Sequence, residues 1–279
     1  MEIAKFLLPM VAALLGIIQT TSEYGVWNPA RRPKIMGDII PLRALGTHRR
    51  KIQQKIVLYH NFFRSSVQPS ASNMLKMKWH NGAARSAQLW ANACQLLIHD
   101  DITGRHVDGY GACGQNIFIA THKVPWWFAV KTWWLEKDDY TYGKYDNRSL
   151  TGHYLQMVWA ATHQIGCGIA KCIHYAGNTP EKNDKGRVYY NYVCNYCPTG
   201  NRPGQLSNPY KIGDSCGRCK RHCRGKLCLN GCHASDLWSN CRQLHKAHPH
   251  WLCHSNTPEG RQRHLYCRAT CTCKRKIHD

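Results

Sequence analysis

Acidic residues are scarce in this sequence. Its 279 residues include 16 Asp and Glu against 38 Lys and Arg, which gives a formal net charge of +22 at pH 7 with histidine neutral. In an intracellular protein, such a balance would indicate binding to nucleic acid. The compartment in which the protein works therefore decides how its charge should be interpreted.

Long hydrophobic runs are also missing, except at the N-terminus. The apolar residues 6–18 follow Lys5 and precede the polar residues 19–22, as in a secretory signal peptide. This run falls short of the roughly 20 apolar residues of a membrane helix, and Lys131 interrupts the tryptophan-rich stretch 125–134. We expect a signal peptide at 1–22, a secreted extracellular protein, and no nucleic-acid partner. The basic surface then points to extracellular anions such as sulfated glycans, lipid headgroups or acidic vestibules of membrane proteins, or to no dedicated partner at all.

Cysteine, in contrast, is abundant and unevenly distributed. Six of the 16 cysteines lie in residues 23–215 and ten in residues 216–279. An even number in an exported chain predicts eight disulfides, and the dense tail is typical of a disulfide scaffold. The turn-rich segment 198–209 fits a linker between two domains. Spacing alone leaves many pairings of the cysteines open.

The larger domain mixes helices and strands. One helix is predicted from Ile52, Ile56, Tyr59 and Phe63, with Thr47 as its N-cap, and another runs from Ala84 to Ile98 after Asn81. Short runs rich in apolar, β-branched and aromatic residues predict strands at 165–170 and 188–194. The pattern favours an α/β sandwich held by three disulfides, without internal repeats.

Two segments of this part are expected at the surface. Residues 23–48 form a basic N-terminal extension with Arg31, Arg32, Lys34 and Arg43, either disordered or laid along the domain. Asn147, in the sequence Asn-Arg-Ser, is a glycosylation acceptor in a secreted chain, so its loop should face solvent.

Several segments together resemble the cysteine-rich secretory protein family. Gly-His-Tyr-Leu-Gln-Met-Val-Trp at 152–159 and Tyr-Val-Cys-Asn-Tyr-Cys-Pro-Thr-Gly-Asn at 192–201 are similar to the two motifs of the CAP superfamily. His60-Asn61 with Arg64, followed by residues 71–79, looks like the first helix of that family and the segment after it. The ten cysteines of the tail, with segments 236–241 and 267–273, look like its cysteine-rich domain. The resemblance covers nearly the whole chain after the leader.

The resemblance implies an α+β fold with two domains. A three-layer α-β-α sandwich, the CAP domain, should occupy 49–199 and a linker 200–215, before a cysteine-rich domain at 216–279. That domain should comprise a hinge at 216–230 and, at 231–279, a subdomain similar to sea-anemone potassium-channel toxins. The family pattern would pair Cys94–Cys172, Cys113–Cys197, Cys167–Cys194, Cys216–Cys223, Cys219–Cys228, Cys232–Cys273, Cys241–Cys267 and Cys253–Cys271.

Relatives gather two histidines and two acidic residues in a cleft of the large domain. The resemblance assigns the histidines to His60 and His153 and one acid to Glu136, while Gln115 stands where the second acid is expected. Two imidazoles and a carboxylate suit Zn²⁺, with Glu136 as a direct or outer ligand. Gln115 keeps hydrogen-bonding capacity but removes a negative charge. Two interpretations remain open: a zinc site, or hydrogen-bonded residues left from a common ancestor.

Motifs of hydrolysis are lacking. The sequence has no nucleophile elbow and no HExxH, and every cysteine is expected in a disulfide. A zinc-dependent hydrolase with Glu136 as base stays a minor alternative.

The tail is strongly basic, with thirteen Lys and Arg against three acids. A rigid cationic module loses little entropy on docking and is steered toward acidic surfaces. The residues assigned to target binding are Arg218, Lys220, Arg221, Arg224, Lys226, Trp238 and Trp251, with Leu237 and Leu252 as further apolar candidates. For Trp238, which is near Cys241, a place in the small core is favoured over target binding. The segment 246–263 is longer and more basic than in the family's compact form and could extend a binding loop or abolish toxin-like binding.

Four tryptophans, Trp126, Trp127, Trp133 and Trp134, lie at helical spacing around Val130. They favour a core helix over a lipid or sterol groove, an activity proposed for the wider superfamily. The leading hypothesis is a secreted, monomeric, non-enzymatic protein that modulates an ion channel or binds another cell-surface target or acidic glycan through its tail. A sterol or lipid carrier is the alternative.

Overall fold

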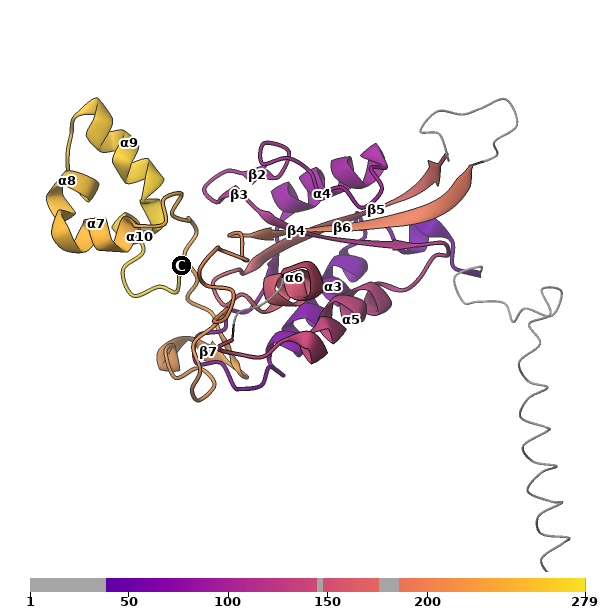
Figure 1. Ribbon diagram of the computed structural model, residues 1–279, viewed down its shortest axis with the longest axis horizontal. Coiled ribbons are helices and arrows are strands. Elements are labelled where there is room, and N and C mark those ends of the chain that lie inside the picture. The colour runs from indigo at the N-terminus through magenta and orange to yellow at the C-terminus, as the bar shows by residue number, and fades with distance from the viewer. Residues whose placement is uncertain (1–38, 145–147, 176–185, 279) are drawn as a thin grey trace, which may run out of the picture.

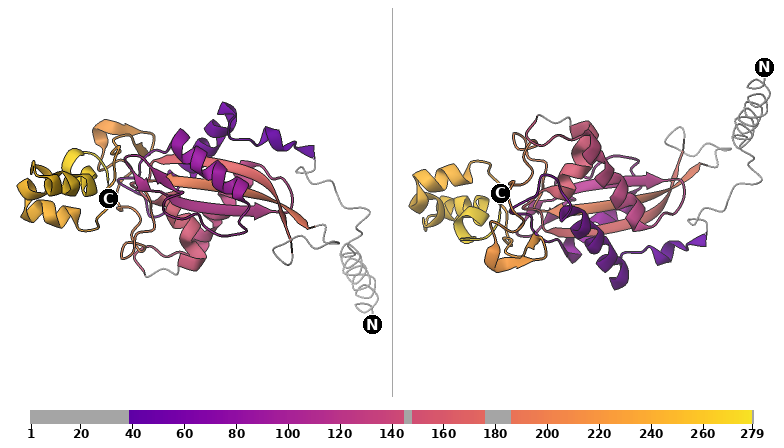
Figure 2. Two further views of the ribbon diagram at one scale, coloured as in Figure 1. Left: turned by 90° about the horizontal axis from the view of Figure 1, so that it is seen from above. Right: turned by 90° about the horizontal axis from the view of Figure 1, so that it is seen from below.

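The computed structural model describes residues 39–144, 148–175 and 186–278 (Figure 1). A four-stranded sheet forms the middle layer, in the order β1 (Lys78–Trp79), β5 (Gln164–His174), β6 (Arg187–Cys197) and β4 (Gly114–Ala120). Helix α4 (Asn81–Ala93) covers one face, while α3 (Arg50–Arg64), α5 (Trp126–Leu135) and α6 (Arg148–Val158) cover the other (Figure 2). The predicted α-β-α sandwich is confirmed.

Helix α4 lies unusually close to the sheet because both surfaces carry small residues. Ala83, Ala87 and Ala91 on its inner face are fully buried. A Cβ on Gly166 would come within 2.0 Å of the Ala84 nitrogen, and one on Gly168 within 2.4 Å of the Gln88 Cα. The helix ends at Ala93 because Cys94 adopts a left-handed conformation (φ 54°), so the predicted extension to residue 98 is wrong.

The opposite face holds the main core. Trp126, Trp133 and Trp134 are buried and Trp127 is 36% exposed, so α5 is a core helix. The Trp126 Nε1–H donates to the Leu45 carbonyl (2.8 Å), which holds residues 39–48 along the domain. Thr47 does not cap α3, since the N-cap is Arg49 and has no capping side chain.

All sixteen cysteines are paired in eight disulfides, and the pairs are those that the family pattern implies. Cys167 and Cys194 are direct neighbours across the β5–β6 ladder, with Cα atoms 4.1 Å apart. None of the eight bonds joins a residue before 230 to one after it.

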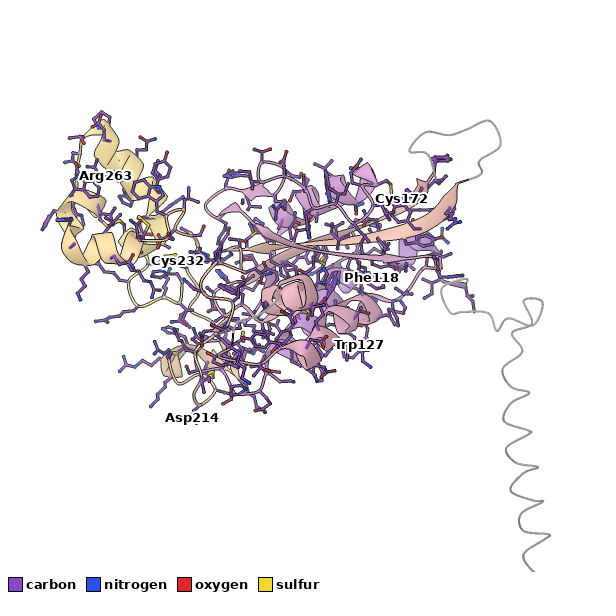
Figure 3. All side chains as sticks on the ribbon, in the orientation of Figure 1. Phe118, Trp127, Cys172, Asp214, Cys232 and Arg263 are labelled. Carbon is purple, nitrogen blue, oxygen red and sulfur yellow. A yellow bond between two sulfur atoms is a disulfide. The ribbon has the colours of Figure 1, made fainter. Side chains whose placement is uncertain are left out.

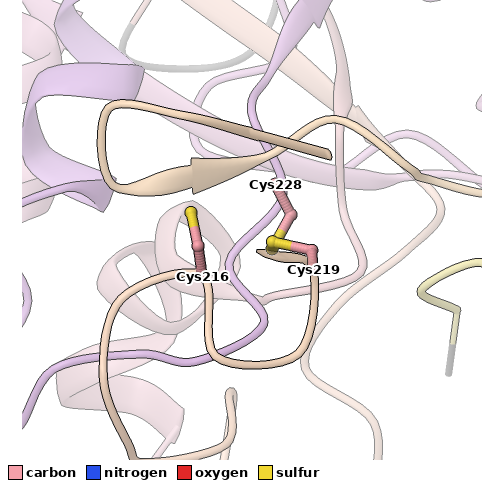
Figure 4. Close-up of side chains that lie close together, drawn as sticks. All are labelled: Cys216, Cys219 and Cys228. Carbon is pink, nitrogen blue, oxygen red and sulfur yellow. A yellow bond between two sulfur atoms is a disulfide. The ribbon is translucent and has the colours of Figure 1, made fainter. Parts of the chain in front are cut away.

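Residues 200–215 are packed against the large domain instead of forming an open linker. Tyr210 is buried in its core, and the Ala160 nitrogen donates to the Pro209 carbonyl (2.8 Å). The hinge, with η5 (Lys220–His222), β7 (Cys223–Arg224) and β8 (Leu227–Cys228), is also attached: Leu75 packs on its cysteines and forms a bridge to Cys228 (Figure 4). The part of the chain that projects from the sandwich therefore begins after the hinge, near residue 230.

The last subdomain consists of four short helices, α7 (Cys241–Ala247), α8 (Pro249–Cys253), α9 (Pro258–Tyr266) and α10 (Arg268–Thr272). It projects from one end of the sandwich, where Figure 3 labels Arg263 and Cys232. Its first residues dock on the hairpin of β2 (His106–Val107) and β3 (Gly111–Ala112): the Ser235 nitrogen donates to the Gly109 carbonyl (3.1 Å). Disulfides replace a large core in this subdomain.

Some predictions concern residues outside the described ranges: the signal peptide at 1–22, the extension up to residue 38 and the glycosylation acceptor Asn147. Among the helices of the described ranges, none combines the length and hydrophobicity needed to cross a membrane.

Candidate functional site

His60 does not lie in an open cleft, so the structure corrects its assignment as a metal ligand. The residue is fully buried in α3. Its Nδ1 lies 2.8 Å from the Ile56 carbonyl, and its Nε2 lies 2.9 Å from the Tyr196 hydroxyl. A carbonyl can only accept, so Nδ1 carries the proton and Nε2 accepts from Tyr196. Burial lowers the pKa of His60 to about 4, and both ring nitrogens are occupied by the core.

His153 and Glu136 do come together. Glu136 begins the short helix η4 (Glu136–Asp139), which follows α5. Its Oε1 lies 2.5 Å from His153 Nδ1, and its Oε2 accepts hydrogen bonds from the backbone nitrogens of His153 (2.9 Å) and Tyr154 (3.0 Å). The carboxylate thus fixes both the ring and the backbone of α6 at this point. Since Nδ1 donates to Glu136, the Nε2 lone pair of His153 is left for a ligand.

A second histidine lies near His153: His99, which the sequence analysis missed, is close enough for the two charges to interact. Its Nδ1 lies 3.0 Å from Gln115 Oε1, which also accepts from the Asp100 nitrogen (3.1 Å). Gln115 Nε2 donates to Asn195 Oδ1 (3.0 Å), so the amide of this buried residue is held in one orientation. Partial burial lowers the pKa of His99; its hydrogen bond to Gln115 opposes this, and the charges of Arg105 and His153 add to the lowering.

His99 and His153 therefore form a matched pair. Each ring directs Nδ1 to an oxygen, and each keeps Nε2 as the unprotonated nitrogen, which is the arrangement of metal-binding histidines supported by outer residues. The oxygens that accept from these rings belong to Gln115 and Glu136, which places both residues behind the histidines and leaves Nε2 of each ring as the atom that could hold a metal ion. The residues fit a divalent ion that prefers imidazole, with two protein ligands and a neutral amide behind one of them.

The cluster Cys216, Cys219 and Cys228 has metal-like proximity but is not a metal site (Figure 4). Cys219 is bonded to Cys228, and Cys216 to Cys223. Metal ligation requires thiolates, and these sulfur atoms are oxidised.

The strongest charge concentration lies where the tail meets the large domain, in a cavity of about 770 Å³ that we call the junction cavity. Six basic side chains line it: Arg202, Lys211, Arg218, Arg242, Arg275 and Lys276. Among its described lining residues, Asp236 is the single carboxylate, and it already accepts hydrogen bonds from the Thr270 nitrogen (2.9 Å) and hydroxyl (2.6 Å). The cavity is an electropositive concavity.

The predicted target-binding bases do not form one patch. Arg218 lines the junction cavity, whereas Arg224 and Lys226 belong to a groove beside α3. Lys220 and Arg221 lie in η5 and are exposed. The hinge therefore divides its charge between two concave surfaces, a division that sequence order does not reveal.

The apolar candidates in the tail differ in exposure. Leu252 is fully buried and is therefore a core residue, while Leu237 is 56% exposed and Trp251 46% exposed. Trp238 is half-buried, packs on Tyr266 with ring centroids 4.9 Å apart, and also lines the junction cavity. Arg263 covers the Trp251 ring at 4.1 Å from its centroid.

A second hollow, the α3–hinge groove, has a volume of about 850 Å³. Val57, Leu58 and Phe62 of α3 form one wall, with Trp79 and Leu227 on the other side. Its rim carries Arg50, Lys76, Arg224 and Lys226. The Trp79 Nε1–H is buried and has no hydrogen-bond partner among the described residues, so it is not offered to the groove, which combines an apolar lining with four basic residues.

The comparisons with known proteins agree with this architecture. A family model described as the cysteine-rich secretory protein family matches residues 57–196, and a model described as Crisp matches residues 216–278. Cysteine-rich secretory protein 2 of Cavia porcellus is 38% identical over 239 residues, covering 84% of this chain and 88% of its own. Cysteine-rich secretory protein 2 of Homo sapiens is 39% identical over 241 residues, covering 84% and 89%.

A solved structure, that of NaASP2 with Zn²⁺, is 26% identical with a TM-score of 0.52 and covers 64% of this chain and 96% of its own. Its name establishes that a protein of this fold can be crystallised with zinc. The relatives are named as secretory proteins, which confirms the predicted secreted, extracellular location. Both family models, the identity along most of the chain and the shared fold lead to one conclusion: the chain belongs to the cysteine-rich secretory protein family.

Proposed function

We propose that this protein is a secreted, non-enzymatic binding protein that docks on an acidic cell-surface target, such as the mouth of an ion channel or an acidic glycan. The observation that carries the proposal is the junction cavity, where six basic side chains from both domains surround one hydrogen-bonded carboxylate. Like charges held together by disulfides and backbone contacts are stabilised when an anion enters. The protein acts as a monomer in this proposal.

The arrangement of Glu136 argues against hydrolysis. A general base needs a carboxylate oxygen directed at a water molecule. Glu136 uses Oε2 for two backbone N–H groups and Oε1 for His153, so three of the four acceptor sites of its carboxylate hold α6 and the His153 ring. We assign it a positioning role.

The test uses the full chain, because the hinge is part of the large domain. Arg218→Glu/Arg242→Glu/Arg275→Glu should weaken binding to a heparin column and any block of potassium, calcium or sodium currents by about tenfold or more. The control is Lys131→Glu/Lys171→Glu/Arg187→Glu, which makes the same change in charge with exposed residues away from the cavity. Equal losses in both variants would reduce the effect to net charge, and no binding by the wild type to either probe would refute the proposal.

We further propose that the cleft binds Zn²⁺ through the Nε2 atoms of His99 and His153. Zinc would supply a positive charge and a coordination position at the surface. The finding that supports this is the pair of Nδ1–H···O contacts, to Gln115 and to Glu136. Calorimetry should show zinc binding that His99→Gln or His153→Gln abolishes. His60→Gln should leave binding intact in any molecules that fold, because His60 faces the core.

One substitution near His99 should raise the affinity for zinc. Gln115→Glu should tighten zinc binding by about 10–100-fold, because a carboxylate behind His99 raises the basicity of its ring. In the structure the Asn195 Nδ2 donates to the Ser86 hydroxyl (2.9 Å). Rotation of the Asn195 amide by half a turn would direct its NH2 to the new carboxylate and its oxygen to the Ser86 hydroxyl. Gln115→Asn is the matched variant without charge. Unchanged affinity in Gln115→Glu would contradict the outer-residue role.

The second candidate function, lipid binding, is favoured by the α3–hinge groove instead of the tryptophan helix. The apolar floor suits one acyl chain, and the rim suits an anionic headgroup. Phe62 and Leu58 are 54% and 63% exposed, so Phe62→Ser/Leu58→Ser should fold and should lose binding of a fluorescent fatty acid. A sterol probe that binds equally well to both proteins would place any sterol elsewhere.

A further inference from the structure

The tail carries a group of histidines that the proposed function does not use. His245, His248, His250 and His254 occur within ten residues, in the segment after Cys241. Two of them, His250 and His254, stand one helical turn apart in and just after α8. Histidines at positions i and i+4 of a helix share one face, which is how a pair of imidazoles can hold a single metal ion.

The geometry of the pair fits such an ion. The two ring centroids are 5.5 Å apart, and the rings are inclined by 54°. A metal–nitrogen bond of about 2.0–2.1 Å puts each ring centre about 3.2 Å from the ion, so two imidazoles on a tetrahedral ion have centres about 5 Å apart. A rotation of either side chain by a small angle closes the difference.

The backbone beneath the pair is held in place. The His254 nitrogen donates to the His250 carbonyl (2.9 Å), and the Leu252 nitrogen donates to the His248 carbonyl (3.0 Å). Between the two histidines, Leu252 is fully buried and Cys253 is bonded to Cys271. Pro249 opens the helix and restricts its first residue. Binding would therefore require little ordering of the chain, which favours affinity.

Both histidines are exposed, so an ion on them would keep open coordination positions. We propose that His250 and His254 form a second metal site, independent of the cleft, for a divalent ion that prefers imidazole, such as Zn²⁺. Its remaining positions would be filled by water and, on docking, by a carboxylate or imidazole of the target. The ion would thereby let a basic tail bind acidic side chains by direct coordination.

The surroundings set the strength of the site. Trp251 lies between the two histidines in the sequence, and the Arg263 guanidinium covers its ring. Lys246 and Arg261 are exposed and lie within a few residues of the histidines in the chain. These positive charges weaken the binding of a cation. We therefore expect the tail site to bind zinc more weakly than the cleft, whose His153 is supported by the Glu136 carboxylate.

The experiment is a zinc titration of the full chain carrying His99→Gln/His153→Gln, so that the cleft does not contribute. Calorimetry should still show one equivalent of zinc, and histidine NMR signals should identify two perturbed rings. His250→Gln or His254→Gln added to this background should each reduce the affinity at least tenfold. His245→Gln, from the same segment, should leave it unchanged.

His250 and His254 are exposed and His245 is half-buried, and unchanged near-ultraviolet circular dichroism would confirm that the variants fold. The proposal is overturned if the background protein binds no zinc, if only one of the paired histidines affects binding, or if His245→Gln lowers the affinity as much as they do. If the wild type binds zinc and the His99→Gln/His153→Gln protein binds none, the tail site is refuted and the site at His99 and His153 is supported.

Discussion

Replacing Arg64 by Met should destabilise the large domain by about 5 kcal/mol or more and sharply reduce the yield of secreted protein. Arg64 is 1% exposed, and its guanidinium donates six hydrogen bonds to five backbone carbonyls: those of Leu75, Met157, Trp159, Ala160 and Thr162. Burial lowers the pKa of Arg64 to about 9, which still leaves it protonated at neutral pH.

The size of the effect follows from what the substitution leaves behind. Four of the five carbonyls belong to residues 157–162, at and beyond the C-terminal end of α6, where a positive charge also interacts favourably with the helix dipole. Without the guanidinium the carbonyls of Leu75, Met157 and Thr162 lose their donors, at a cost of about 1–3 kcal/mol for each group left unsatisfied. The Trp159 and Ala160 carbonyls keep a backbone donor each, from the Thr162 and Leu75 nitrogens. Methionine fills the space but donates nothing.

Denaturant unfolding of the secreted protein measures the loss. Arg64→Lys should give an intermediate result, because an ammonium keeps the charge but has three donors for five carbonyls. Arg50→Met, at an exposed position of the same helix, should shift the free energy of unfolding by less than about 0.5 kcal/mol. Similar midpoints for Arg64→Met and Arg50→Met would show that the carbonyls find other partners.

Acid should destabilise the protein strongly between pH 6.5 and pH 4. Burial lowers the pKa of His60 and of His163 to about 4 each, from 6.5 in the unfolded chain. Within this window the unfolded state binds protons that the folded state does not, so stability falls as the pH falls. Each residue contributes about 3 kcal/mol to the loss, which is complete below pH 4.

Burial is the main cause of both low pKa values, and nearby positive charges add to it: Arg64 for His60, and Arg64, His233 and Lys78 for His163. Hydrogen bonds to backbone carbonyls, of Ile56 for His60 and of Ala161 for His163, act in the opposite direction but are outweighed. Chemical unfolding at pH 7, 6, 5 and 4 would measure the slope. His163→Gln should lower stability at pH 7 but flatten the curve by about half, and a wild-type curve without slope in this window would refute the account.

The sequence predicted the layers and the disulfide pattern, but it misassigned one half of the cleft. His60 and Arg64 stand in the segment that resembles the first helix of the family, which is α3; both side chains lie in the core and serve packing and hydrogen bonding there. His99 lies in a loop beyond α4 and meets Gln115 only because β4 passes beside that loop. Periodicity carries no information about such a contact. The neighbouring acids Asp100 and Asp101, rare in this basic chain, were the available signal.

The packing of the linker and hinge could not be predicted from the sequence, for a similar reason. Glycine and proline in 198–209 indicated a turn-rich linker, and in the structure Tyr210, just after it, fills the core of the large domain while Leu75 packs against the cysteines of the hinge. Glycine and proline predict that the backbone turns, but they do not predict whether the turn packs against the rest of the protein. The number of cysteines likewise predicted a disulfide-rich tail, but it did not predict that the hinge, which holds the first four of them, packs against the large domain.

The disulfide map has a consequence for the lifetime of the protein outside the cell. Five bonds lie entirely before residue 230 and three entirely after it, and Leu229 between them is 41% exposed. A single proteolytic cut at 229–231 would therefore leave the four-helix fragment, with its own three crosslinks intact, held to the large domain by noncovalent contacts alone, such as that of Ser235 with Gly109. The junction cavity would then last only as long as those contacts, without any reductant being needed to open it.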